Sequence, residues 1–235
     1  MRINKYISES GKSSRRGADK LIAEGRVTIN GEQITLGSVV EPGDDVRIDG
    51  NPVRVVSNKV YLALNKPVGI TSTTEKDVKG NIVDLVNHPL RVFHIGRLDK
   101  DSEGLILMTN DGDIVNEILR SEHRHEKEYI VSVDKPITPD FLKKMSAGVE
   151  ILDTTTLPCQ TFQLSKYDFK IILTQGLNRQ IRRMCSALGY RVQRLQRIRI
   201  MNIHLDKLPP GQWRDLSKKE KNQLFSELNY EPKEW

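Results

Sequence analysis

The sequence has few cysteines and no long apolar stretch. Only two cysteines, Cys159 and Cys185, occur in 235 residues. They are too few for a disulfide framework or a cysteine-rich zinc site, and neither has a histidine at a metal-ligand spacing. We therefore expect both to be reduced and structural. The longest apolar runs, 60–64 and 105–108, are far shorter than the roughly 20 residues of a membrane-spanning helix, so membrane insertion is excluded.

Signals for secretion and for metal binding are missing as well. The first residues, MRINKYISESG, contain no apolar segment and no small-residue cleavage site, so we expect a cytoplasmic protein. His123 and His125 stand close together with no third ligand in view. We interpret both as surface residues and expect neither a metal nor a cofactor.

Acidic residues are missing from one long segment. Between Leu173 and Leu205 there are none, yet seven arginines fall there, and the first 26 residues hold seven Lys/Arg against three Asp/Glu. The whole chain has a net charge of +6. One basic run is usually a solvated face, but two separate runs favour a polyanionic partner.

The pattern of apolar residues indicates two domains. Residues 1–56 combine two short helical repeats with strand-like pieces around the Asn30-Gly31 turn, which predicts a small module of two helices and a sheet. Residues 57–235 show strands and helices without a regular βαβ alternation, which predicts an α+β domain with a mostly antiparallel sheet. We expect strands near 60–64, 104–109, 127–133, 168–174 and 190–205, and helices near 82–86, 113–120, 138–147, 178–188 and 217–226.

The densest polar cluster is the segment from Gly96 to Gly104, which leads into an apolar strand. A carboxylate on a loop that a buried strand anchors is held rigidly while staying reachable. Asp99 is therefore the best candidate nucleophile, although an aspartate that only forms a turn would show the same spacing.

Two further elements place suitable side chains. Tyr129 stands on the largely apolar face of the predicted strand 127–133, where it can stack on a base or simply join a core. On the helix predicted near 178–188, the apolar positions leave Arg179, Arg182 and Arg183 on the opposite face. An arginine of this face beside a carboxylate would keep it ionised and oriented, but three solvated arginines fit the pattern equally well.

Together these segments resemble the RsuA-type family of RNA pseudouridine synthases, closest to the RluF branch that modifies large-subunit (23S) ribosomal RNA. The resemblance covers nearly the whole chain, with an S4-like RNA-binding domain first and a pseudouridine synthase domain after it. The residues that carry it are 4–7, 14–19, 25–27, 30–31, 64–69, 96–112, 127–129 and 176–184.

The resemblance implies roles for individual residues. Asp99 would be the catalytic carboxylate, Tyr129 would stack on the target base, Arg182 would be the basic partner of Asp99, and Arg97 would help to displace the nucleotide. RNA would be the partner, with 23S ribosomal RNA as the substrate and tRNA as a second candidate, and the enzyme would be a monomer. The remaining expected RNA contacts are Lys5, Lys12, Arg15, Arg16, Lys20, Arg26, Lys66, Arg179 and Arg183.

The chemistry agrees with these residue types. Converting uridine to pseudouridine breaks the N1–C1′ bond, turns the base and rejoins it through C5, which needs a carboxylate at C1′, excluded water and a base taken out of its stack.

Two alternatives remain at this point. One is a non-catalytic RNA-binding ribosome-assembly factor, and the other is a hydrolase that pairs Asp99 with Asp101 or Glu103. Pseudouridine, free uracil or neither, formed from labelled ribosomal RNA, would separate the three.

Overall fold

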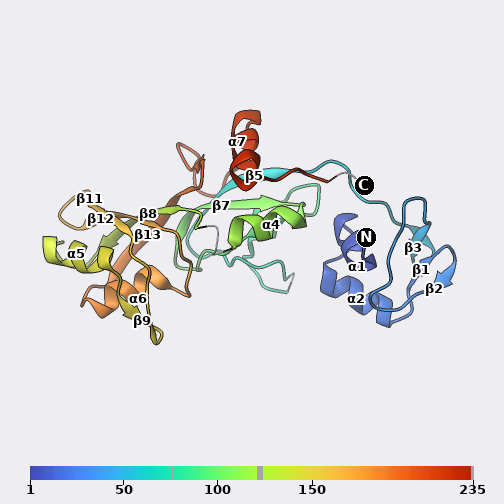
Figure 1. The fold of residues 1–235 in the computed structure, drawn as a ribbon, viewed down its shortest axis with the longest axis horizontal. Helices are drawn as coiled ribbons and strands as arrows, with labels where there is room; N and C mark the ends of the chain where they lie inside the picture. Colours follow the sequence, from blue (N-terminus) through green and yellow to red (C-terminus); the bar gives the residue numbers. More distant parts are fainter. Residues whose placement is uncertain (76, 121–123, 234–235) are drawn as a thin grey trace.

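The computed structural model describes residues 1–75, 77–120 and 124–233. Its amino-terminal part consists of α1 (Ile3–Glu9), α2 (Arg15–Ala23) and the strands β1 (Val27–Ile29), β2 (Glu32–Gln33), β3 (Val46–Ile48) and β4 (Asn51–Pro52). The strands pair in the order β2-β1-β3-β4. Ser14 caps α2 by accepting a hydrogen bond from the amide of Gly17. The expected module of two helices and a small sheet is confirmed, and Figure 1 shows it at one end of the long axis.

An irregular connector, residues 53–60, links this module to the rest of the chain. The predicted domain boundary after residue 56 falls in this segment and stays a prediction. Polar contacts also join the two parts: Lys5 reaches both carboxylate oxygens of Asp113 at 2.7 Å, and Lys59 lies 3.1 Å from Glu9.

The second part is built on one long sheet. Its strands follow the order β11-β12-β8-β13-β7-β5-β15, with β14 added to β13 and β6 added to β7. A separate hairpin, β9 (Glu150–Ile151) and β10 (Thr154–Thr155), lies outside this sheet. The strands of the long sheet are β5 (Tyr61–Lys66), β6 (Phe93–Ile95), β7 (Glu103–Thr109), β8 (Lys127–Val133), β11 (Gln160–Gln163), β12 (Asp168–Leu173), β13 (Val192–Ile200), β14 (Ile203–His204) and β15 (Trp213–Asp215).

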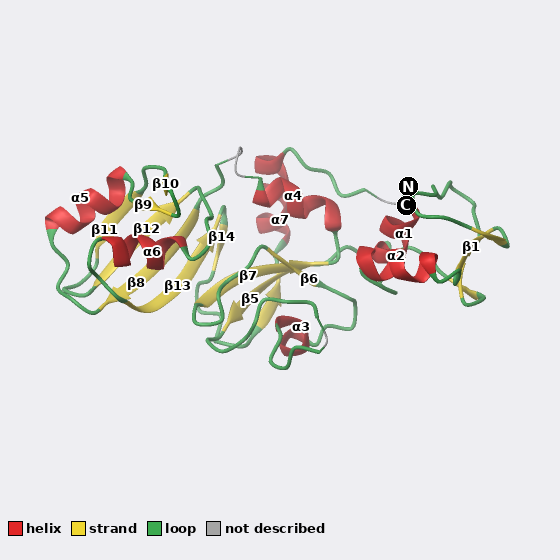
Figure 2. Cartoon of the chain, turned by 90° about the horizontal axis from the view of Figure 1, so that it is seen from below, coloured by secondary structure: helices red, strands yellow, loops and turns green. Residues whose placement is uncertain are grey.

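Helices cover the sheet in two groups. In one half, α5 (Pro139–Ala147) and α6 (Gln180–Ala187) pack on the apolar side chains of β8, β12 and β13. In the other half, α4 (Gly112–Leu119) and α7 (Lys218–Leu228) cover one face of β5 and β7, while α3 (Ile82–Val86) covers the opposite face (Figure 2). This explains why 61–64 is a continuous apolar run: both faces of β5 are buried. None of the described helices is long and apolar enough to cross a membrane.

The two halves of the sheet meet where β13 lies between β8 and β7. The strands β13 and β7 run parallel, with Gln196 opposite Glu103 and Arg197 opposite Gly104, whereas the other pairs of this sheet that involve β5, β7, β8, β12 or β13 are antiparallel. Gly104 has φ +105°, and a Cβ there would stand 2.2 Å from the carbonyl oxygen of Arg197. Only glycine permits this close crossing.

One predicted element is wrong in its extent. The run 190–205 was expected to be a single strand, but β13 ends at Ile200 and returns as β14. Met201, with φ +50°, forms the turn. Apolar alternation continues through such a hairpin, because both of its strands face the same core, and the sequence pattern therefore hides the turn.

Candidate active site

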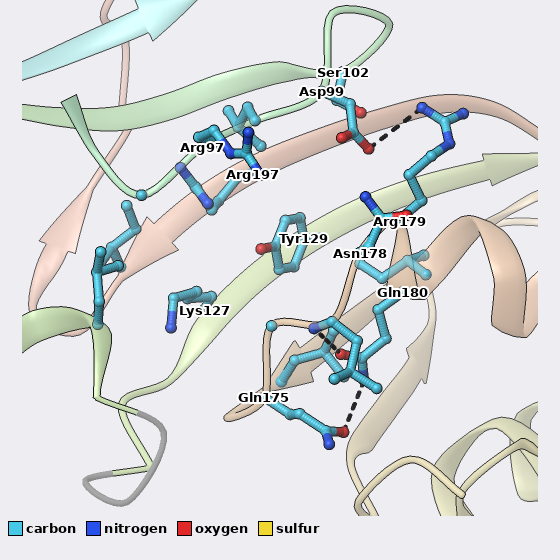
Figure 3. Close-up of a pocket in the computed structure, with 18 of the residues that line it drawn as sticks. Arg97, Asp99, Ser102, Lys127, Tyr129, Gln175, Asn178, Arg179, Gln180 and Arg197 are labelled. Carbon is cyan, nitrogen blue, oxygen red and sulfur yellow. Dashed lines mark hydrogen bonds and ion pairs between the residues drawn. The ribbon is translucent and has the colours of Figure 1, made fainter. Parts of the chain in front are cut away.

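A cavity of about 360 Å³ opens where the two halves of the sheet meet. The loop between β6 and β7, the strands β8 and β13, and the segment that leads into α6 form its walls. Figure 3 shows Asp99 and Arg179 on one side of the Tyr129 ring and Lys127 on the other. The sequence-predicted residues Arg97, Asp99, Tyr129 and Arg179 thus meet at one site.

The backbone of the loop that carries Asp99 is fixed by hydrogen bonds with Gly69 and Ser72. The Ser72 hydroxyl donates to the carbonyl of Leu98 at 2.8 Å and accepts from its amide at 3.2 Å. The amide of Gly69 donates to the carbonyl of Lys100 at 2.7 Å. These bonds bracket Asp99 on both sides, so its carboxylate is held by a rigid backbone while a third of the side chain stays exposed.

The charged neighbour of Asp99 is Arg179. Its Nη1 lies 3.5 Å from Asp99 Oδ2, and its two terminal nitrogens also hold Asp101 at 3.1 and 2.9 Å. The hydrogen bonds from Arg179, opposed by partial burial and aided by the nearby Arg182, lower the pKa of Asp101. Arg179 stands at the N-cap position of α6 in the left-handed region, with φ +50°, and its side chain reaches Asp99 and Asp101 on the facing loop.

Arg182 does not pair directly with Asp99, which corrects the predicted contact. Its Nη2 donates to the carbonyl of Asp101 at 2.8 Å and to the hydroxyl of Ser102 at 3.0 Å, and its Nε lies 3.5 Å from Asp101 Oδ2. Its side chain has an exposed fraction of 14%. Arg182 therefore fixes the loop, and through the loop the position of Asp99.

Tyr129 lies on β8 and forms part of the cavity wall. Its ring packs partly against two core clusters, and the guanidinium carbon of Arg197 lies 6.0 Å from the ring centroid. The ring therefore contacts the core on one part of its surface and the cavity on another. The core reading of its sequence position is confirmed, and stacking on a base stays a prediction.

Two cavity residues escaped the sequence analysis. Lys127 begins the same strand as Tyr129, and burial together with the charge of Arg197 lowers its pKa to about 8. Arg197 is almost completely buried. The register of β8 with β13 places it opposite Tyr129, but the sequence alone gives no such register, and its neighbours Arg191, Arg194 and Arg199 make it look like one more solvated arginine.

Three of the expected RNA contacts, Lys66, Lys5 and Arg26, bind other groups of the protein. Lys66 is fully buried, and its ammonium donates to the carbonyls of Pro67 and Ile70 at 2.9 Å. A phosphate contact by Lys66 is therefore wrong. Lys5 is half-buried against Asp113, and Arg26 pairs with Asp49 at 2.6 Å. Of the expected RNA contacts, the exposed residues are Lys12, Arg15, Arg16, Lys20, Arg26, Arg97, Arg179 and Arg183.

The cysteine and histidine expectations have separate outcomes. Both cysteines are free, and burial raises the pKa of the Cys159 thiol to about 11 and of the Cys185 thiol to about 12. His123 lies outside the described residues. His125 is half-buried, with Nε2 3.1 Å from the carbonyl oxygen of Glu117, so it lies at the surface but is not fully solvated. Among the described residues no three His, Cys, Asp or Glu side chains form a group that could hold a metal ion.

Comparison with known proteins agrees with this geometry. Residues 60–187 match the RNA pseudouridylate synthase family and residues 1–46 match the S4 domain. The chain is 56% identical to the dual-specificity RNA pseudouridine synthase RluF of Escherichia coli strain K12, over 96% of this chain and 78% of that protein. It is 40% identical to an uncharacterized RNA pseudouridine synthase of Aquifex aeolicus, over 99% and 98% of the two chains.

A crystal structure of a pseudouridylate synthase has the same fold. It matches 95% of this chain and 99% of its own with a TM-score of 0.71 at 30% identity. The chain belongs to the RsuA-type RNA pseudouridine synthase family. It is an isomerase that acts on RNA, so the predicted fold class and reaction are confirmed, and the non-catalytic alternative is set aside.

Proposed function

We propose that this enzyme isomerises a specific uridine of large-subunit (23S) ribosomal RNA to pseudouridine, with Asp99 acting at C1′ of the target nucleotide. The observation that carries the proposal is the placement of a rigidly held, partly exposed carboxylate at the mouth of a cavity whose wall contains Tyr129. The similarity to RluF supports the ribosomal substrate.

The reaction assigns a task to each part of the cavity. Asp99 attacks C1′, or holds the charge that develops there, while the N1–C1′ bond breaks and its electron pair leaves with the base. The base stays on the Tyr129 ring, turns, and forms the new bond from C5 to C1′; where Asp99 has bonded to C1′, this step breaks that bond and releases the carboxylate. The proton lost from C5 balances the proton gained at N1. The cavity walls exclude the water that would otherwise turn the reaction into hydrolysis.

The exposed cations supply placement. Lys12, Arg15 and Arg16 lie on or beside α2, and they form no ion pair among the described residues. Arg97 lines the cavity mouth, where it can contact the backbone of a displaced nucleotide. We assign phosphate contacts to both groups, since phosphate neutralisation provides most of the affinity of such proteins. We place the reaction in the cytoplasm and expect a monomeric enzyme, because the cavity walls come from one chain.

A second RNA substrate follows from the same similarity. The relatives named RluF are described as having dual specificity, and we propose tRNA as the second substrate class of this enzyme. Incubation of the enzyme with purified tRNA and with 23S ribosomal RNA, followed by pseudouridine mapping, tests both assignments. Pseudouridine in the ribosomal RNA alone would remove the second.

The catalytic assignment is tested by exchanging each of two neighbouring carboxylates. Asp99→Asn keeps the size of the side chain but removes the charge and the nucleophile, so single-turnover pseudouridine formation should fall by more than about a thousandfold. RNA affinity should stay near normal or rise slightly, because a negative charge facing phosphates is lost.

Asp101→Asn is the matched control. It weakens the contact with Arg179 and should cost activity only in part, since Asp101 holds the loop and does not meet the substrate. An active Asp99→Asn enzyme, or an Asp101→Asn variant that is equally inactive with its fold intact, contradicts the assignment.

A further inference from the structure

Arg197 occupies an unusual position in the wall of the cavity. It lies opposite Tyr129 on the neighbouring strand, and only 4% of the residue is exposed. Its Nε donates to the carbonyl of Leu105 at 2.7 Å, across the parallel junction of β13 and β7. One edge of the guanidinium is therefore held by backbone, which fixes the direction of the other edge.

That other edge is unsatisfied. Nη2 of Arg197 is buried and has no hydrogen-bond partner among the described residues, and no described carboxylate forms an ion pair with this arginine. A buried charged donor without a partner is costly, and proteins retain one where a bound molecule completes it. Because Arg197 lines the cavity beside Tyr129, the missing acceptor belongs to whatever lies on that ring.

The electrostatics of the cavity are asymmetric. Asp99 and Arg179 offset each other at the mouth, whereas Lys127 and Arg197 both bring positive charge to the inner part. The charge of Arg197 and burial together depress the pKa of Lys127. The inner part of the cavity is therefore suited to an acceptor with partial or full negative charge.

Uracil has this character at its carbonyl oxygens. Breaking the N1–C1′ bond leaves the electron pair on the base, and the resulting charge spreads over N1, O2 and O4. A fixed cationic donor stabilises such charge without reorganisation. At position 4 the same donor also discriminates: uracil offers a carbonyl there, whereas cytosine offers an amino group whose N–H bonds would face those of the guanidinium.

We propose that Nη2 of Arg197 donates a hydrogen bond to O4 of the target uracil stacked on Tyr129, and that Arg197 thereby selects uracil against cytosine. The proposal rests on the function proposed above, in that it places the target base on Tyr129. It does not depend on which RNA contains that base.

The test exchanges groups on both sides of the bond. The positions at which the enzyme forms pseudouridine are first mapped on total cellular RNA, so that the ribosomal assignment is not presupposed. A short RNA segment that contains one of these positions then serves as the substrate. The target position carries uridine, 4-thiouridine or 2-thiouridine, because sulfur accepts hydrogen bonds weakly. Single-turnover rates are compared for the wild-type enzyme and for Arg197→Met.

The ratio of the 4-thiouridine rate to the uridine rate should be about five- to tenfold lower for the wild-type enzyme than for Arg197→Met. The reason is that the variant has already lost the hydrogen bond that sulfur weakens. The 2-thiouridine ratio should be the same for both. Arg194→Met is the matched control, because Arg194 lies on the same strand, half-exposed and paired with Glu103. It should keep the full wild-type ratio.

A second readout measures selectivity. The same RNA with cytidine at the target position should compete poorly with substrate on the wild-type enzyme and at least about fivefold better on Arg197→Met. The proposal would be overturned if the ratio of the 4-thiouridine rate to the uridine rate were equal in wild type and variant. It would also be overturned if the 2-thiouridine ratio, and not the 4-thiouridine ratio, differed between them.

Folding of the variant is controlled separately. If Arg197→Met fails to fold, Arg197→Lys, which keeps the charge and loses the planar fork, takes its place with the same expected direction. The wild-type enzyme alone also tests the proposal. If its rate on the 4-thiouridine substrate is not lower than its rate on the 2-thiouridine substrate, there is no hydrogen bond to O4. Absence of pseudouridine from ribosomal RNA, with pseudouridine elsewhere, would remove the proposed substrate and leave this inference standing.

Discussion

Tyr129 belongs both to the core and to the wall of the cavity. Its ring contacts two core clusters and the cavity together, so its removal affects stability as well as turnover. Tyr129→Phe keeps the ring and should retain most single-turnover activity, whereas Tyr129→Ala should lose at least about a hundredfold, because the base loses its stacking surface. Thermal unfolding of both variants separates the packing contribution. If Phe proves as inactive as Ala, the hydroxyl takes part in proton transfer and the stacking role is insufficient.

Lys127 predicts a dependence on pH. Its folded-state pKa of about 8 lies below the ordinary 10.5 because of burial and the charge of Arg197. Lys127 is therefore charged below about pH 8 and neutral above it. We expect a charged Lys127 to stabilise the negative charge of the departing uracil, so the single-turnover rate should fall as pH rises through about 8. Lys127→Arg should move this decline to higher pH, since arginine stays protonated.

Lys66 is a second group that titrates in the same pH range. Burial, opposed by the nearby charges of Asp101 and Asp99, also lowers its pKa to about 8, while its ammonium donates to the carbonyls of Pro67 and Ile70. A decline that persists at pH 8 in Lys127→Arg would assign the effect to another group and refute the role of Lys127.

At the scale of elements, the start of α7 is fixed by a small charged network. Ser217 and Glu220 form a reciprocal capping box, and both Glu220 oxygens bind Arg214 at 2.7 and 2.8 Å. The hydrogen bond from Arg214, opposed by partial burial and aided by Ser217, lowers the pKa of Glu220 to about 2.

Glu220→Gln should therefore lower the free energy of unfolding at pH 7 by about 1–2 kcal/mol. Because the folded-state pKa lies below the ordinary 4.5, the contribution is complete above about pH 4.5 and is lost as pH falls towards 2. The difference between wild type and variant, measured by urea unfolding, should shrink between pH 5 and pH 3. A difference that does not change with pH would exclude the charge as its origin.

The elements that the sequence predicted well are those with strong local signals. The helices predicted near 82–86 and 178–188 have clear apolar spacing. In the structure α3 coincides with the first range and α6 lies within the second. The short edge strands β11 and β15 were missed because they are too brief and too exposed to alternate visibly. The site shows the same division. The loop around Asp99 was evident from its polar motif, whereas Arg197 became visible only through strand register.

At the scale of the molecule, we expect RNA affinity and chemistry to lie on different parts. Arg15 and Arg16 are exposed on α2, far along the long axis from the cavity (Figure 1). Neutralising both in the full chain should weaken RNA binding and reduce the slope of log Kd against log salt by about one to two units, with the rate at saturating enzyme unchanged. Lys218→Ala with Lys219→Ala, on exposed positions of α7, is the matched control and should leave the slope near that of the wild type. Equal slopes for the two pairs would contradict a division of labour.

The parallel junction of β7 and β13 also governs how the enzyme comes into being. Leu105 and Arg197, joined there by a hydrogen bond, are 92 positions apart in the chain. At the usual speed of translation, β7 waits about 5–20 s for its neighbour. During that interval the edge of β7 at Glu103 and Gly104 has no partner strand, because β6 covers only Leu107 to Thr109 of that edge, and an open strand edge can pair with another chain. Until β13 leaves the ribosome the cavity lacks a wall, so a newly made enzyme cannot modify RNA before its synthesis is nearly finished.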